Sequence, residues 1–173
     1  MRVLQKFYEK VGLISDWSGK GVSILVPALI LSVVIEVFAR YALNSPTIWS
    51  YTVSYMMGTV IIALGMCYVY YHHANVRVDI FYTRLSRKWQ LVIDTSLTAF
   101  LFFPLVFMLT KVWAQDTWHS YLCGDVPTQG IWYPPLWPFK ALITIGFALL
   151  LLQGFAMFLK DVASLSKGGE EPW

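Results

Sequence analysis

The chain has 173 residues, of which 57% are hydrophobic and 13% are charged, and its formal net charge is +3. This balance excludes an ordinary soluble globular domain, in which about a quarter of the residues are charged. The length accommodates four membrane crossings of about 20 residues each and leaves no room for a second domain. We therefore expect one all-α membrane domain, residues 1–173.

The N-terminal segment, residues 1–20, has the pattern of an amphipathic helix. Val3, Phe7, Val11 and Ile14 recur at helical spacing, and charged residues occupy the other faces. Such a helix is typical of the headgroup boundary at the membrane surface. We expect it to lie there, either as a simple anchor or as a contact for a partner protein.

Four apolar stretches are long enough to cross about 30 Å of hydrocarbon as helices. They cover residues 22–43, 51–71, 91–112 and 139–159. Between the second and the third stretch, residues 78–89 form another amphipathic segment, which we also expect on the membrane surface. The chain is thus predicted to be a four-helix transmembrane protein with additional surface helices.

Lysine and arginine residues predict the orientation of this bundle. Ten of them lie in the two tails and in the connection between the second and third stretches: Arg2, Lys6, Lys10, Lys20, Arg77, Arg84, Arg87, Lys88, Lys160 and Lys167. The opposite side has Arg40, Lys111 and Lys140. Because positively charged flanks stay in the cytoplasm, we expect both termini and the surface helices inside the cell.

The segment 114–137 is then predicted to be an external loop rich in aromatic residues and proline. Its candidate docking residues are Trp118, Tyr121, Trp132, Tyr133 and Trp137. Tryptophan and tyrosine are enriched at membrane–water interfaces, which would explain an aromatic belt. Rigid rings on a proline-stiffened backbone equally suit a docking surface for another protein. Both explanations stay open from the sequence.

Glu36 is the deepest ionisable residue of the first stretch. An unpaired charge at that depth would cost several kcal/mol. Arg40 lies one helical turn further along the same face, and the order Glu then Arg is favourable. We predict an intramembrane ion pair with a structural role, and a proton-carrying role for Glu36 is the alternative.

The sequence offers few groups for catalysis or for binding a cofactor. His72 and His73 lie at the inner end of the second stretch, whereas His119 lies in the external loop, so haem or metal ligation across facing helices is disfavoured. Cys67 and Cys123 are similarly separated, and no metal-ligand spacing occurs. No nucleotide loop or catalytic triad is present. We expect neither an enzyme nor a resident cofactor or metal.

Several short motifs follow one another along the chain. They are Arg40-Tyr41-Ala42-Leu43-Asn44-Ser45-Pro46, Trp49, Gly65, Val76-Arg77-Val78-Asp79, Leu85-Ser86, Asp94 and Pro134-Pro135-Leu136-Trp137-Pro138-Phe139-Lys140. In this order and spacing they resemble the small, DctQ-like membrane subunit of TRAP transporters, the tripartite ATP-independent periplasmic transporters of bacteria and archaea. The resemblance covers essentially the whole chain.

The resemblance implies a part in importing an organic acid. In that family a periplasmic binding protein delivers the substrate to a large membrane subunit, which holds the substrate and sodium sites. The small subunit supports the scaffold in the bacterial or archaeal inner membrane. The motif residues expected at subunit contacts, with anchoring or capping within this chain as the alternative for each, are Arg40, Asn44, Trp49, Arg77, Asp79 and Asp94.

Two other classes of protein have few transmembrane helices and no catalytic site. One is a self-sufficient four-helix exporter, in which Glu36 would exchange protons for cationic drugs. Such exporters are shorter and have little loop, so the external segment and the surface helices would have no role. The other is a membrane anchor of an oxidoreductase, which the separated histidines disfavour. Transport by this chain alone would indicate the exporter, and haem absorbance would indicate the anchor.

Overall fold

The computed structural model describes residues 2–72, 74, 86–128 and 132–166, and these residues form helices and their connections without a strand. The helices are α1 (Arg2–Ala42), α2 (Ser50–Tyr71), α4 (Arg87–Leu97), α5 (Phe103–Cys123) and α6 (Trp137–Ser166), with the π-helical turn η1 (Thr98–Phe102) between α4 and α5.

Four helical stretches are long and apolar enough to cross a membrane. They are Lys6–Ala42, Ser50–Tyr71, Trp89–Cys123 and Trp137–Leu165. The predicted fold class, an all-α protein with four membrane-crossing helices, is confirmed for the described residues. The inside location of both termini stays a prediction.

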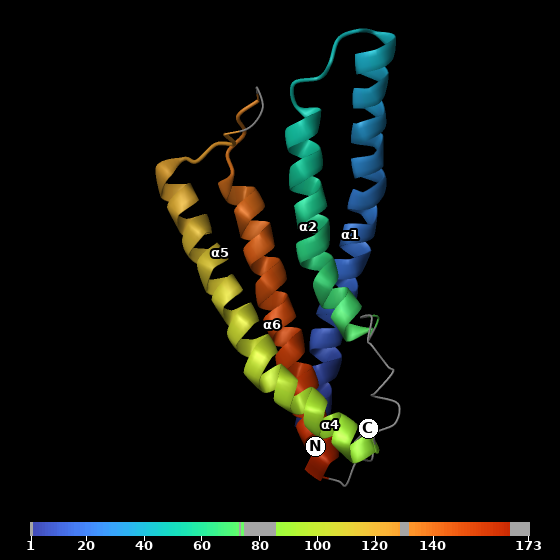
Figure 1. Cartoon of the computed structure of the whole chain (residues 1–173), viewed down its shortest axis with the longest axis vertical. Coiled ribbons are helices and arrows are strands. Elements are labelled where there is room, and N and C mark those ends of the chain that lie inside the picture. The colour runs from blue at the N-terminus through green and yellow to red at the C-terminus, as the bar shows by residue number, and fades with distance from the viewer. Residues whose placement is uncertain (1, 73, 75–85, 129–131, 167–173) are drawn as a thin grey trace.

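The helices run between two distinct ends of the bundle. The start of α1 and the end of α6 lie at one end (Figure 1), which we call the terminal end. The other end, which we call the loop end, holds the connection 43–49 between α1 and α2 and the described parts of the connection between α5 and α6, residues 124–128 and 132–136. The positions of the basic residues predict that the loop end faces the periplasm.

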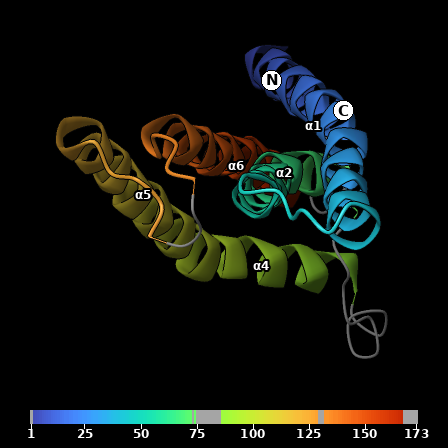
Figure 2. The same cartoon turned by 90° about the horizontal axis from the view of Figure 1, so that it is seen from above.

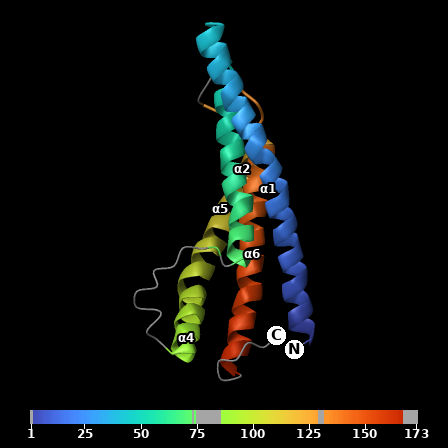
Figure 3. The same cartoon turned by 90° about the vertical axis from the view of Figure 1, so that its right-hand side faces the viewer.

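Helix α1 is continuous through the position where a separate surface helix was expected to end. Its 41 residues make it about 60 Å long, or twice the hydrocarbon thickness, and Figure 3 shows it running the length of the molecule. The expected break between residues 20 and 22 is absent. Residues 2–20 and the first crossing are therefore one helix.

Small residues explain why the N-terminal half of α1 joins the bundle. A Cβ atom added at Gly12 would clash with the ring of Tyr71, and one added at Gly19 would clash with the ring of Tyr68. Because glycine has no side chain, two helices can approach each other closely at these positions, and such close packing is typical of helices that associate in a membrane. The stripe formed by Gly12, Ser15 and Gly19 therefore packs on α2, whereas Trp17 remains exposed.

The third crossing is one bent run of α4, η1 and α5. Pro104 lacks a backbone N–H, and in a regular helix its ring would clash with the carbonyl of Phe100. The wider turn η1 ends at Phe102, two residues before this proline, and such bulges change the direction of a helix. Figure 2 shows the bend between α4 and α5.

The end of this crossing differs from the sequence prediction. Helix α5 continues to Cys123, so residues 114–123 are helical and the predicted loop 114–137 is wrong over this part. Gly124 ends the helix with a φ of 67°, a left-handed conformation that glycine adopts without steric cost. Trp137 in turn begins α6, so the described parts of the connection are residues 124–128 and 132–136.

Most of the second predicted surface helix, 78–89, lies outside the described residues, as do the motif residues Arg77 and Asp79 and the histidine His73. Of its described part, Ser86 precedes α4 and Trp89 lies within it. Helix α4 also contains Asp94, so this motif residue lies at the terminal end of the bundle.

Helix α6 is the helix shared by the whole bundle, because it contacts α1, α2, α4 and α5. Gly146 allows the closest approach: a Cβ atom there would lie 2.7 Å from the backbone carbonyl of Ala63 in α2. Further along, Gly154 faces the ring of Phe102. Ile143 and Gln153 are almost completely buried on the same helix, so α6 forms the core of the protein.

A buried polar cluster joins three helices toward the terminal end. The Ser15 hydroxyl of α1 lies 2.9 Å from Oε1 of Gln153 in α6 and 3.0 Å from Sγ of Cys67 in α2. The hydroxyl has one proton to donate, and the thiol can donate to its oxygen. Hydrogen bonds between membrane helices contribute on average about 0.6 kcal/mol each, so this cluster sets the register of the three helices more than their stability.

We expect Gly146→Ala to destabilise the bundle. The added methyl group meets the α2 backbone, which cannot rotate away, and overpacking costs about 1–3 kcal/mol, more than the gain of at most about 1 kcal/mol in helix propensity. Thermal unfolding in detergent should show a lower midpoint than for the native chain. The matched control is Gly58→Ala, because nothing lies within 4 Å of the Cβ position at Gly58. Equal midpoints for the two variants would contradict the close α2–α6 contact.

Candidate functional site

Glu36 and Arg40 lie together near the end of α1. Nη2 of Arg40 is 2.7 Å from Oε1 of Glu36, and its Nε is 3.2 Å from the same oxygen. The second carboxylate oxygen accepts the backbone N–H of Thr47 at 3.0 Å and also the Thr47 hydroxyl. The Glu36 side chain is 15% exposed. Its carboxylate therefore ties the end of α1 to the connection that leads into α2.

The motif residues of this connection end one helix and begin the next. Asn44 has a φ of 50°, a left-handed conformation that asparagine tolerates better than most residues. The following N–H, of Ser45, donates to the carbonyl of Ala39 at 3.0 Å. Trp49 directly precedes the first residue of α2. Arg40, Asn44 and Trp49 thus shape the loop end of α1 and α2.

A second polar cluster lies at the same end and was not predicted from the sequence. Nζ of Lys140 in α6 lies 2.9 Å from Oδ2 of Asp116 in α5 and 3.3 Å from Oδ2 of Asp125 in the following connection. The Lys140 side chain is 13% exposed. A nearby hydrogen bond between the hydroxyls of Thr117 and Thr144, at 2.9 Å, also joins α5 to α6.

Asp125 is the residue through which the connection between α5 and α6 is held. Its carbonyl accepts the N–H of Leu136 at 3.0 Å, and its carboxylate lies 3.7 Å from Nδ1 of His119. Partial desolvation raises the pKa of the Asp125 carboxyl, but Lys140, through its hydrogen bond and its charge, acts together with Ser120 and His119 to lower it, so the pKa lies below its ordinary value. Asp125 is therefore ionised at neutral pH.

The two aspartates line a cavity of about 550 Å³. Helix α2 supplies Tyr51, Thr52 and Tyr55 to its wall, and α5 supplies Trp113. Thr52 is 4% exposed, and its hydroxyl oxygen has no hydrogen-bond partner within the described part of the chain. The cavity thus combines carboxylates, aromatic rings and a buried hydroxyl at the loop end.

The aromatic residues predicted to form a docking loop are partly brought together. The rings of Trp118 and Tyr121 on α5 are 6.1 Å apart, and Tyr121 meets Trp137 of α6 edge-on at 5.6 Å. Trp118 and Tyr121 are 65% and 58% exposed. Trp132 and Tyr133 belong to the connection that follows and are also exposed. We call Trp118, Tyr121 and Trp137 the aromatic row.

The two described histidines lie at opposite ends and contact carboxylates. Nε2 of His72 is 2.7 Å from Oδ1 of Asp16, which joins the end of α2 to α1. His119 lies beside Asp125, and its Nε2 is 3.5 Å from Sγ of Cys123. Cys67 and Cys123 are both free thiols. Within the described ranges, no group of three or more metal-ligating side chains is arranged to hold a metal ion.

The fold and these clusters define a four-helix membrane component in which the polar groups hold helices and connections in place. A family model described as "Tripartite ATP-independent periplasmic transporters, DctQ component" matches residues 29–164, which is most of the chain. The chain therefore belongs to the DctQ family: it is a TRAP transporter small membrane subunit, a component of the bacterial inner membrane and not an enzyme. No curated protein and no solved structure matches it.

Glu36→Gln is expected to keep the α1–α2 connection folded, because the amide oxygen still accepts the N–H of Thr47. Glu36→Leu removes both carboxylate oxygens, so the N–H of Thr47 and the guanidinium group of Arg40 lose their hydrogen-bond acceptor. Trypsin should cleave the Leu variant after Arg40 several-fold faster than the native chain, whereas the Gln variant should resemble the native chain and support normal uptake. Complete loss of uptake by a normally assembled Gln variant would instead indicate a proton-carrying role for Glu36.

Acid should loosen the loop end through Asp125. A carboxyl whose pKa is depressed by folding contributes its full stabilisation above the unfolded pKa of about 3.9, and this contribution is lost as the pH falls through the folded value. The thermal midpoint of the native chain should therefore drop more between pH 7 and pH 3 than that of Asp125→Asn, which has no carboxyl to titrate. Parallel pH profiles would show that the Asp125–Lys140 contact contributes nothing.

Proposed function

We propose that this chain is the static scaffold subunit of a sodium-driven TRAP transporter that imports an organic acid. The large membrane subunit would hold the substrate and the sodium ions, and a periplasmic binding protein would deliver the substrate. Membership of the DctQ family is the observation that carries this proposal, and the distribution of polar residues in the bundle supports it.

The core of the bundle offers no charged path for a substrate among the described residues. Its fully buried polar side chains toward the terminal end, Ser15 and Gln153, are neutral and bond to each other. Two sets of ion pairs lie near the loop end, Glu36 with Arg40 and Lys140 with its two aspartates, and Asp16 contacts His72 at the end of α2. Ionisable groups within a membrane protein usually mark an ion or substrate pathway. The neutral core of the described residues therefore favours a scaffold role over a substrate-carrying one.

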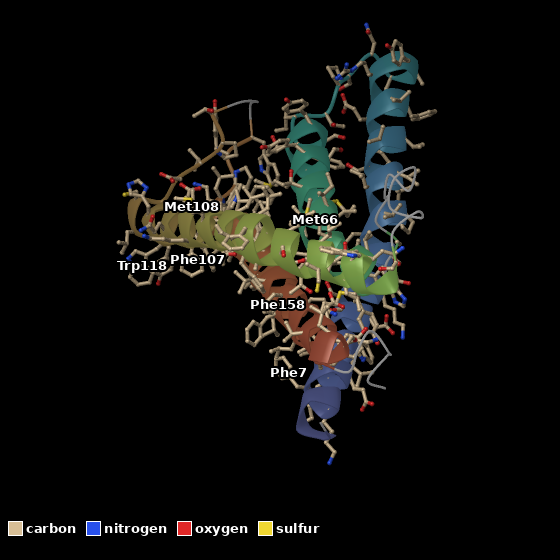
Figure 4. All side chains as sticks on the ribbon, turned by 60° about the horizontal axis from the view of Figure 1, so that its bottom comes forward. Phe7, Met66, Phe107, Met108, Trp118 and Phe158 are labelled. Atoms are coloured by element: carbon tan, nitrogen blue, oxygen red, sulfur yellow. The ribbon has the colours of Figure 1, made fainter. Side chains whose placement is uncertain are left out.

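The outside of the helices supports extensive contact with lipid and with a larger neighbour. Phe100 of η1 is 84% exposed, and Phe107 and Met108 of α5 are 61% and 69% exposed. Figure 4 shows Phe107, Met108 and Trp118 along α5. Helix α5 packs along α6, which leaves its remaining apolar surface for the bilayer or the large subunit.

The shape of the chain suits a part that must stay still while a neighbour moves. Helix α1 is about twice as long as the hydrocarbon is thick. The third crossing bends between α4 and α5 (Figure 2). Residues anchored at both interfaces set the tilt of membrane helices. A long helix and a bent one, joined through α6, would resist tilting more than four short straight helices.

Reconstitution into liposomes tests this proposal. We expect no uptake with this chain alone, and sodium-dependent uptake of an organic acid once the large subunit and the substrate-loaded binding protein are present. Omitting this chain from the complete mixture should abolish uptake, and replacing the sodium gradient by a potassium gradient serves as the control. Proton-coupled drug transport by this chain alone would contradict the scaffold role and indicate an exporter.

A further inference from the structure

The cavity at the loop end carries an unbalanced charge. Asp116 and Asp125 are opposed by the single ammonium group of Lys140, so the two carboxylates and the lysine sum to a formal charge of −1. The two aspartate side chains are 45% and 32% exposed, whereas that of Lys140 is 13% exposed. The lysine therefore lies beneath the carboxylates, and each carboxylate keeps lone pairs that a further donor can reach.

The walls of the cavity favour a cation as the occupant. Tyr51 and Tyr55 lie one turn apart on α2 and are 62% and 63% exposed, and Trp113 lines the cavity from α5. The faces of such rings attract ammonium and guanidinium groups. Thr52 also lines the cavity, but its hydroxyl is buried, so the accessible charged acceptors of the wall are the carboxylates. Carboxylates and aromatic rings together are complementary to a basic side chain.

We propose that this cavity receives an arginine or lysine side chain of the periplasmic binding protein. The inference rests on the proposed function and on the predicted orientation, which places the loop end in the periplasm. The exposed aromatic row lies at the same end of the bundle, because Trp118 and Tyr121 are near the end of α5 and Trp137 begins α6. A soluble partner approaching the membrane would meet both features together.

Partly exposed charges suit a partner that must dock and leave in every transport cycle. Complementary potentials at an interface raise the rate of encounter more than they slow dissociation. A large buried apolar contact would instead hold the binding protein too long. The acidic cavity would therefore guide and orient the binding protein, with the affinity remaining low enough for release.

The test uses the complex of this chain with its large subunit in nanodiscs, and the cognate binding protein as the probe. Asp116→Asn keeps the shape of the side chain and removes one charge, so the dissociation constant of the binding protein should rise about tenfold. Asp116→Lys should abolish binding. Asp161→Asn, the same substitution in α6 toward the terminal end, is the control and should leave binding unchanged. The native complex should also lose affinity as the salt concentration rises, with a shallower slope for Asp116→Asn.

The outcomes separate this inference from the proposed function. Two results would overturn the inference if the large subunit still co-purifies. One is equal binding by the native complex and both Asp116 variants, and the other is binding that does not depend on salt. Loss of the large subunit on Asp116→Asn would assign the cavity to that subunit and would also overturn it. A native chain that does not co-purify with the large subunit at all would contradict the proposed function itself.

Discussion

The structure depends on the close crossing of α6 with α2, where Gly146 leaves the α2 backbone at Ala63 in direct contact with α6. Helix α6 contacts each of the described helices α1, α2, α4 and α5. It carries Lys140 toward one end and Gln153 about 20 Å further along. A change in the spacing or rotation of α6 would therefore disturb the salt-bridged cluster at the loop end and the buried polar cluster toward the terminal end at the same time.

The distribution of charge follows from the hydrocarbon environment. An uncompensated ion is costly within the bilayer, and two sets of charges near the loop end are paired: Glu36 with Arg40, and Lys140 with two aspartates. In the core the polar contacts are neutral. This arrangement gives a rigid body with specific connections at one end, which is what a subunit needs if it supports a moving neighbour and presents a surface to a soluble partner.

The sequence predicted the features that depend on local patterns. Hydropathy located α2 to within one residue, since 51–71 was expected and Ser50–Tyr71 is observed. The spacing of Glu36 and Arg40 placed their side chains on one face, and the structure brings them into contact. Gly124 was an available stop signal for α5, because glycine commonly follows the last helical residue. Residues 114–123 were nevertheless predicted to lie in the loop 114–137, whereas contacts of Asp116 and Thr117 with α6 keep this part helical.

Other features depend on contacts between distant parts of the chain and had no local signal. The pairs Asp16–His72 and Ser15–Gln153 form only once α1, α2 and α6 are in register. Lys140 holds the end of α5 through Asp116, which explains why the helix extends beyond the apolar stretch. The stripe of Gly12, Ser15 and Gly19 was a usable clue, because small residues at this spacing mark a helix-packing face in membranes.

The two native thiols provide the most direct test of a bundle that presents its loop end to the periplasm. Cys123 is exposed at the loop end, and Cys67 is completely buried between the helices. A membrane-impermeant maleimide added to intact spheroplasts should label Cys123 and leave Cys67 unlabelled until the protein is denatured, with Cys123→Ser as the control. Labelling of Cys123 only after the cytoplasmic face is opened would reverse the orientation and contradict the account.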